Sequence, residues 1–320
     1  MSKASAVRNE NKEKIIIQTP WKKAIKRDWQ LYLMLLFPVI MVCVFSYAAY
    51  PGLRMVFMDY KPAKGYDGSE WVGWATFAKL FKDADFIRAL KNSIVFNILG
   101  LVLGFPMPVI LALILNELRF PTFKKISQTI LYLPHFLSWA IIGGVAYTLF
   151  RTGSGMVNIV MMNWGWIEEG IPFLTEKFHW AATYLLIGVW AGMGWGTIIY
   201  LAAITGISGE LYEAAMIDGA NRWQRMWNIT IPGIKGTMVT LLIMSLGRLM
   251  GSNLEALKAF DNALVKDFQY QLAIYVYEKG LQSGKFSLST ASNLFQSLVG
   301  VILVLLADRF AKWLGEEGLL

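Results

Sequence analysis

The sequence predicts an all-α integral membrane protein with six transmembrane helices. Of its 320 residues, 56% are hydrophobic and only 16% are charged, a composition far more apolar than that of soluble domains. Because backbone groups in lipid must be hydrogen-bonded within the protein, each span is expected to be a helix. Six apolar stretches are long enough to cross about 30 Å of hydrocarbon; they cover residues 31–53, 93–115, 129–150, 181–204, 234–252 and 288–307.

The segments at the two ends of the chain are polar. The first 30 residues contain eight Lys or Arg residues and no pattern of a cleavable signal peptide. We expect residues 1–30 and 309–320 to be cytoplasmic tails, and residues 31–308 to form the membrane domain. The single cysteine, Cys43, lies in the first span, so no disulfide bond within the chain is expected.

Glycines recur at four-residue intervals in two of the spans. Gly188, Gly192 and Gly196 lie in the fourth span, and Gly100 and Gly104 lie in the second. Small residues at this spacing let helices approach closely in lipid. We expect tight packing at these positions, within the subunit or against a second subunit, ahead of direct contact with a ligand.

A polar segment, residues 205–236, separates the fourth and fifth spans, and its first part favours a helix. Ser208 can cap that helix, and Glu210 lies in its first turn, where the helix dipole favours a negative charge. Gly219 can adopt the left-handed conformation that ends a helix. Pro232 can begin the next one.

The same segment contains a spaced motif. Glu213-Ala214-Ala215 is followed after three residues by Gly219, and nine residues later by Ile229-Thr230-Ile231-Pro232. This spacing resembles the loop of permease subunits of binding-protein-dependent ABC importers, with Ile231 where leucine is usual. The resemblance implies a type I importer permease fold, in which the loop forms a cytoplasmic coupling helix that docks in a cleft on an ATPase subunit. The residues it implicates in that contact are Glu213, Ala214, Ala215, Asp218, Gly219, Arg222 and Pro232. An ordinary amphipathic connector is the alternative, which the register of Gly219 and Pro232 disfavours.

The resemblance extends over about residues 29–320. Segments 133–136, 200–204 and 272–320 are similar to the oligosaccharide and polysaccharide branch of these permeases, and within it to permeases of bacterial alginate importers. The resemblance implies a multi-pass protein of the bacterial inner membrane with both termini in the cytoplasm. It implies as partners a second, different permease, two ATPase subunits and a solute-binding protein, with ATP and Mg²⁺ held by the ATPases and no cofactor on this chain.

Several other functions are disfavoured by what the sequence lacks. It has no G-x-x-x-x-G-K-[ST] motif, so ATP hydrolysis is expected in another chain and this chain is not expected to be an enzyme. No Asp or Glu lies in any predicted span, which disfavours a secondary transporter or a membrane enzyme.

The net charge of +8 is spread along the chain, which suits contact with anionic lipid rather than with nucleic acid. No metal site is expected at His135 or His179. Charge density alone favours cytoplasmic termini only slightly.

Four polar residues are candidates for the substrate pathway. Arg248 lies near the outer half of the fifth span, where a charge is costly and usually faces protein or water. One interpretation is a snorkelling arginine, or one paired with Glu255; the other is contact with an anionic sugar, because arginine binds carboxylates bidentately. Asn253, Asn293 and Gln296 can hydrogen-bond sugar hydroxyls or other helices. An alginate-like polyuronate is the favoured substrate, and a neutral oligosaccharide is the alternative.

Overall fold

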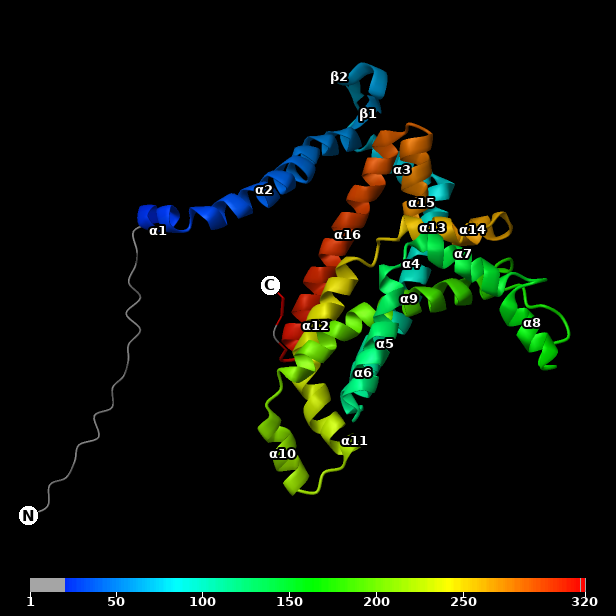
Figure 1. Ribbon diagram of the computed structural model, residues 1–320. Coiled ribbons are helices and arrows are strands. Elements are labelled where there is room, and N and C mark those ends of the chain that lie inside the picture. Colours follow the sequence, from blue (N-terminus) through cyan, green and yellow to red (C-terminus); the bar gives the residue numbers. More distant parts are fainter. Residues whose placement is uncertain (1–20, 317, 320) are drawn as a thin grey trace, which may run out of the picture. The chain divides into compact units, whose positions relative to one another are not determined.

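The computed structural model describes residues 21–316 together with residues 318 and 319, so most of the predicted N-terminal tail, residues 1–20, lies outside the described residues. The chain divides into two units, Met1–Leu53 and Arg54–Leu320 (Figure 1).

The N-terminal unit contains α1 (Trp21–Arg27), α2 (Trp29–Phe45) and the start of a 3₁₀ helix, η1 (Tyr47–Phe57). The helical stretch Trp29–Phe57 is long and apolar enough to cross a membrane, and it contains the first predicted span. No residue of α2 is buried. Its sequence is apolar on nearly every face, as expected of a helix that lies in lipid.

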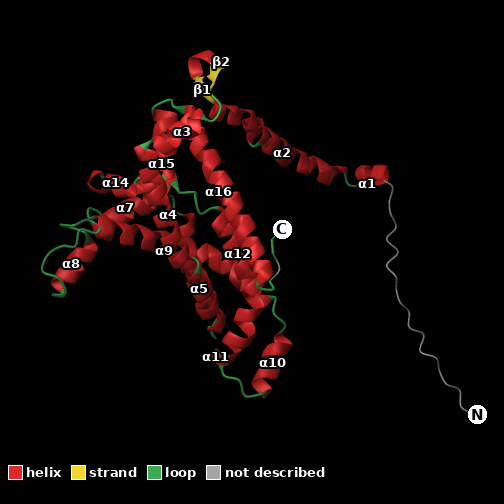
Figure 2. Cartoon of the chain, turned by 180° about the vertical axis from the view of Figure 1, so that it is seen from behind, coloured by secondary structure: helices red, strands yellow, loops and turns green. Residues whose placement is uncertain are grey.

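The main unit is a helical bundle with a β-hairpin at one end. Strands β1 (Met58–Lys61) and β2 (Gly65–Trp71) are antiparallel and are joined by η2 (Pro62–Lys64). Figures 1 and 2 place the hairpin at one end of this unit and the two short helices α10 and α11 at the opposite end. The helices after the hairpin are, in chain order, α3 (Ala75–Lys82), α4 (Ala84–Gly104), α5 (Pro106–Glu117), α6 (Pro121–Tyr132), η3 (Leu133–Phe136), α7 (Trp139–Phe150), α8 (Met156–Asn163), α9 (Lys177–Thr205), α10 (Gly209–Ile217), α11 (Arg222–Arg225), η4 (Met226–Thr230), α12 (Ile231–Gly247), α13 (Leu254–Ala259), η5 (Ala263–Val265), α14 (Lys266–Gln269), α15 (Leu272–Val276), η6 (Tyr277–Gln282) and α16 (Phe286–Trp313).

Four further helical stretches of the main unit match predicted spans. The stretches Ala84–Glu117, Lys177–Thr205, Arg222–Gly247 and Phe286–Trp313 are each long and apolar enough to cross a membrane. The fifth span ends earlier than predicted, at Gly247 rather than at residue 252. Within the second span, α5 begins at Pro106, whose missing N–H is tolerated at the start of a helix.

The third predicted span, residues 129–150, is wrong as a single straight helix. The stretch Pro121–Phe136 and α7 are bent against each other by 104°. The backbone is extended at Leu137, and Ser138 begins a new helix because its hydroxyl accepts the N–H of Ile141. The apolar run is continuous through the bend, so hydropathy did not reveal it.

Two apolar clusters hold the main unit together. The larger one lies towards the hairpin end and surrounds Trp180, which is fully buried and donates its indole N–H to the carbonyl of Phe260 at 3.0 Å. Tyr184 stacks on Trp180 with ring centroids 5.0 Å apart. The smaller cluster joins α5, α9 and α12, and its members are Val109, Ala112, Leu115, Tyr200, Leu201, Ile204 and Ile234.

Candidate functional site

The loop that carries the spaced motif forms a solvent-exposed helix, α10. Ser208 precedes the helix as predicted, although its hydroxyl makes no capping hydrogen bond. Gly219 has a φ of +77°, which confirms the predicted left-handed helix end. Its N–H bonds the carbonyl of Met216 at 3.1 Å, and the N–H of Ala220 bonds the carbonyl of Ala215 at 2.8 Å. These two bonds form a Schellman motif, which satisfies carbonyls that the helix leaves unpaired.

No residue of α10 is buried. Glu213, Ala214 and Asp218 are exposed, and so are three apolar side chains at the two ends of the helix. These are Leu211, Met216 and Ile217, with exposed fractions of 54%, 53% and 86%. The helix therefore presents both apolar and acidic side chains to its surroundings.

The chain returns from α10 to the bundle through α11 and a π-helical turn. Asn221 caps α11 and exchanges hydrogen bonds with Gln224 in a capping box. Arg222 lies 4.0 Å from Glu117, at the end of α5. The π-turn η4 follows, and Pro232 stands in the first turn of α12 as predicted.

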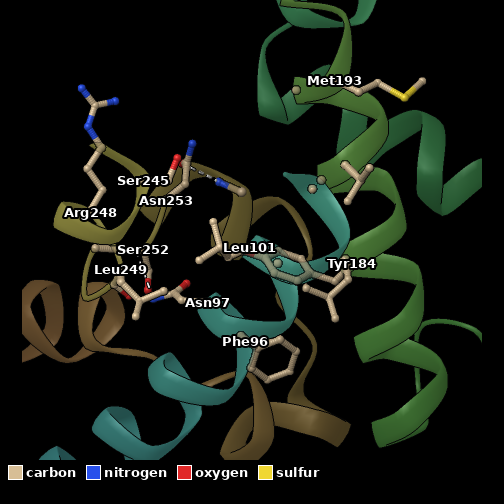
Figure 3. A pocket seen from close by; sticks show the side chains of 18 of the residues that line it. Phe96, Asn97, Leu101, Tyr184, Met193, Ser245, Arg248, Leu249, Ser252 and Asn253 are labelled. Carbon is tan, nitrogen blue, oxygen red and sulfur yellow. Dashed lines mark hydrogen bonds between the residues drawn. The ribbon is translucent and has the colours of Figure 1, made fainter. Parts of the chain in front are cut away.

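A cavity of about 450 Å³ opens between α4, α9 and the segment that follows α12. In Figure 3, Arg248 and Asn253 lie on one side of this pocket, across from Tyr184 and Met193 of α9. Its volume is within the range of about 300–1,000 Å³ that is usual for ligand sites. The polar side chains that line it are Asn97, Tyr184, Ser245, Arg248, Ser252 and Asn253.

Arg248 lies just beyond the last turn of α12, where a cation is favoured by the negative end of the helix dipole. Its side chain is exposed. Within the described part of the chain it forms no ion pair, so the pairing with Glu255 that the sequence suggested is not formed. Figure 3 shows its guanidinium directed away from Asn97 and Tyr184.

Asn97 is a pocket residue that the sequence analysis did not single out. Its amide donates to the carbonyls of Leu249 at 2.7 Å and Gly251 at 3.2 Å, and so it fixes the turn that carries Arg248. The signal in the sequence was a lone asparagine in an apolar span, one turn before Leu101. Asn253 lines the same pocket, and its side-chain oxygen caps α13 by accepting the N–H of Ala256 at 3.0 Å.

Comparison with known proteins identifies the family. Residues 104–316 match the family described as "Binding-protein-dependent transport system inner membrane component". The chain belongs to this family. It is 43% identical to the polygalacturonan/rhamnogalacturonan transport system permease protein YteP of Bacillus subtilis (strain 168), over 90% of this chain and 89% of YteP. It is 38% identical to protein LplB of the same strain, over 93% of each chain.

Two solved structures are similar to the permease along nearly its whole length. A bacterial ABC transporter involved in the import of the acidic polysaccharide alginate matches with a TM-score of 0.81 and 36% identity, over 91% of this chain and 98% of that one. A bacterial alginate ABC transporter in complex with an alginate pentasaccharide-bound periplasmic protein matches with a TM-score of 0.81 and 35% identity, over 93% and 99%. The predicted type I importer permease fold is thereby confirmed.

The permease does not bring its four predicted pathway residues together. Arg248 and Asn253 share the pocket described above, whereas Asn293 and Gln296 lie on α16 and do not line it. Asn293 is exposed. The amide of Gln296 donates to the carbonyl and hydroxyl oxygens of Ser292, one turn earlier in the same helix.

The glycines of α9 differ in their surroundings. A Cβ at Gly196 would lie 2.9 Å from Cγ of Pro108, so the predicted close packing is confirmed there. Gly188 and Gly192 line the pocket instead, and a Cβ at either position would meet no other atom within 4 Å. Of the two predicted alternatives, packing within the chain does not occur at these two glycines, and packing against a second subunit stays a prediction. Gly100 and Gly104 also line the pocket. A Cβ at either position would lie 3.8 Å from a side chain of α9, which is an ordinary contact distance.

A cluster of charges anchors α4 to the segment before α16. Lys279 lies 2.9 Å from Asp85 and 3.3 Å from Asp83, and its side chain is only 17% exposed. Arg88 lies 2.6 Å from Asp85 and 2.7 Å from Asp267. Partial burial lowers the pKa of Lys279, but the hydrogen bonds to Asp85 and Asp83 outweigh it and leave that pKa raised.

Proposed function

We propose that the permease moves an acidic oligosaccharide, an alginate-like polyuronate, across the bacterial inner membrane along the pocket that Arg248 lines. The observation that carries this proposal is Arg248, which has an exposed side chain, forms no ion pair among residues 21–316 and is one of the residues that line a cavity of ligand size. A guanidinium presents its N–H groups in a planar fork that fits a carboxylate. On the same wall, the amide N–H groups of Asn253 can donate to sugar hydroxyls, and the Ser252 hydroxyl, which donates to Gln271, can still accept.

The relatives support an acidic substrate. YteP carries polygalacturonan and rhamnogalacturonan in its name, and polygalacturonan is a polymer of a uronic acid. The solved transporter with a TM-score of 0.81 imports alginate, an acidic polysaccharide. A neutral oligosaccharide would make no use of the cation at residue 248.

Uptake of two substrates by one variant tests the proposal. Arg248→Ala should reduce uptake of a uronate oligosaccharide by up to about fivefold, because an ion pair at an exposed site contributes about 0.2–1 kcal/mol. Uptake of a neutral oligosaccharide of the same length should change little. Arg309→Ala, which removes an exposed arginine far along α16, is the matched control. Equal losses for the two substrates would refute a role in carboxylate recognition and favour a neutral substrate.

We also propose that α10 docks on a partner ATPase subunit and that this chain is the non-catalytic partner of a second permease, two ATPases and a solute-binding protein. ATP and Mg²⁺ would be held by the ATPases. In support, α10 exposes apolar and acidic side chains together, and the relative with a bound periplasmic protein is an ABC transporter.

The ion pairs of the bundle agree with six spans and cytoplasmic termini. Arg222, beside α10, lies near Glu117, and Lys235, one turn into α12, lies 2.5 Å from Glu316 in the C-terminal tail. These contacts join the three segments that a six-span topology puts on one side of the membrane. If α10 meets an ATPase, that side is the cytoplasm.

Two substitutions test the docking of α10. Glu213→Arg reverses a charge on the exposed surface, and Gly219→Pro removes the left-handed helix end, because proline cannot adopt a φ of +77°. Both should abolish co-purification of the ATPase subunits while the permease stays in the membrane. Glu169→Arg reverses a charge outside the loop and should have no effect. Normal ATPase binding by both loop variants would overturn the proposal.

A further inference from the structure

The attachment of α10 to the bundle is unusually sparse. The hydroxyl of Tyr212 lies 3.0 Å from the hydroxyl oxygen of Thr230. In the part of the chain that the structure describes, this is the only side-chain hydrogen bond or ion pair between residues 209–218 and another element. Otherwise α10 is tied to the bundle through its two chain ends, one of which passes through the left-handed Gly219.

The two ends of this bond differ in rigidity. Tyr212 belongs to an exposed helix, whereas Thr230 is only 2% exposed and is the last residue of the π-turn η4. The next residue, Ile231, begins α12, and one turn further Ile234 is fully buried in the cluster that joins α12 to α5 and α9. A movement of Tyr212 would therefore act on the packed helix α12 at its N-terminal end.

The backbone around Thr230 is adjusted to the proline that follows. Pro232 has no N–H, so it cannot serve as the α-helical donor to the carbonyl four residues earlier. The chain makes a π-turn there, and the N–H of Ile231 bonds the carbonyl of Met226. Single π-turns inside helices are frequent at functional sites. This turn places the Thr230 side chain where the Tyr212 hydroxyl meets it.

We propose that the Tyr212–Thr230 hydrogen bond transmits movement of α10 to α12, and that these two are positioning residues for coupling. From Ile231, α12 runs 17 residues, or about 25 Å at 1.5 Å per residue, and it ends beside Arg248 at the pocket. The bond is the short connection between the docking surface and the helix that reaches the pocket. This inference rests on the proposed docking of α10 on an ATPase subunit.

Three variants of the complete complex, reconstituted with its solute-binding protein, test the inference. Tyr212→Phe and Thr230→Val each remove one hydroxyl and should lower the amount of substrate transported per ATP about fivefold, the factor that one hydrogen bond of ordinary net strength represents. The ATPase subunits should still co-purify in full. The double variant should be no worse than either single variant, because both remove the same interaction.

Conservative replacements separate transmission from folding. Thr230→Ser keeps a hydroxyl and should retain the wild-type ratio of transport to ATP hydrolysis. Thr240→Val removes a hydroxyl that bonds only the carbonyl of Gly236 in the same helix, and it should also be neutral. An unchanged ratio in Tyr212→Phe, or additive losses in the double variant, would overturn the inference. If the ATPase subunits still co-purified with every α10 variant, Glu213→Arg included, the docking of α10 itself would be refuted.

Discussion

Replacing Gly219 by alanine isolates the backbone's contribution to the end of α10. The φ of Gly219 is +77°, and a Cβ in the left-handed region costs roughly 1–2 kcal/mol. A Cβ at this position would have no atom within 4 Å, so no clash adds to that cost. Because every 1.4 kcal/mol is a factor of ten, the open form of the helix end should become about 5 to 30 times more populated.

Hydrogen exchange measures that opening directly. The N–H of Ala220 is protected by its 2.8 Å bond to the carbonyl of Ala215, and opening releases it. Peptides that cover this bond should exchange about 5 to 30 times faster in Gly219→Ala. Gly219→Asn is the matched control, because asparagine enters the left-handed region more readily, and its rate should lie between those of wild type and Gly219→Ala. The melting temperature should not change, since α10 buries no residue. Wild-type exchange in the alanine variant would refute the reasoning.

The charged cluster gives two further predictions. Lys279→Met should destabilise the main unit by about 1–3 kcal/mol, because it removes the cation beside Asp83, whereas Asp85 keeps its ion pair with Arg88; thermal unfolding in detergent measures this, and an unchanged melting temperature would contradict it. The second prediction concerns alkaline pH. The pKa of Lys279 is raised, and burial raises the phenol pKa values of Tyr270 and Tyr275. Groups whose pKa is raised on folding stabilise the fold fully below their unfolded values, here about 10 to 10.5, and this stability is lost as pH rises through the folded values. The melting temperature should therefore fall as pH rises above about 10, and less steeply in Lys279→Met.

The positions of the spans and of the exposed loop were predictable because they follow from local properties. Hydropathy depends on composition over about twenty residues, and five of the six stretches correspond to helices of sufficient length. Gly219 was predictable for a similar reason: only glycine enters the left-handed region without strain. Neither inference needs to know what lies next to the segment.

The pocket was not predictable from the sequence, because it depends on which faces of the helices meet. Gly188 and Gly196 belong to the same series of glycines at four-residue intervals, yet Gly188 lines the cavity and Gly196 packs against Pro108. Asn97 and Asn293 are likewise both lone asparagines in apolar spans, and only Asn97 reaches the turn after α12. The bend at Leu137 was hidden because helix direction is set by backbone dihedral angles, while hydropathy is the same on both sides of it.

The bare backbone of α9 at Gly188 and Gly192 affects how a polymer would pass the pocket. Glycine has no rotamers to freeze, so contact with this wall costs no side-chain entropy. It also presents few atoms, and dispersion attraction grows with the number of atoms in contact. A ligand would meet bare backbone only at these two glycines, because Tyr184, Leu185, Val189 and Met193 of α9 also line the pocket. If the proposed substrate passes this pocket, its retention would depend on the side chains around these two positions and on Arg248 rather than on the two glycines.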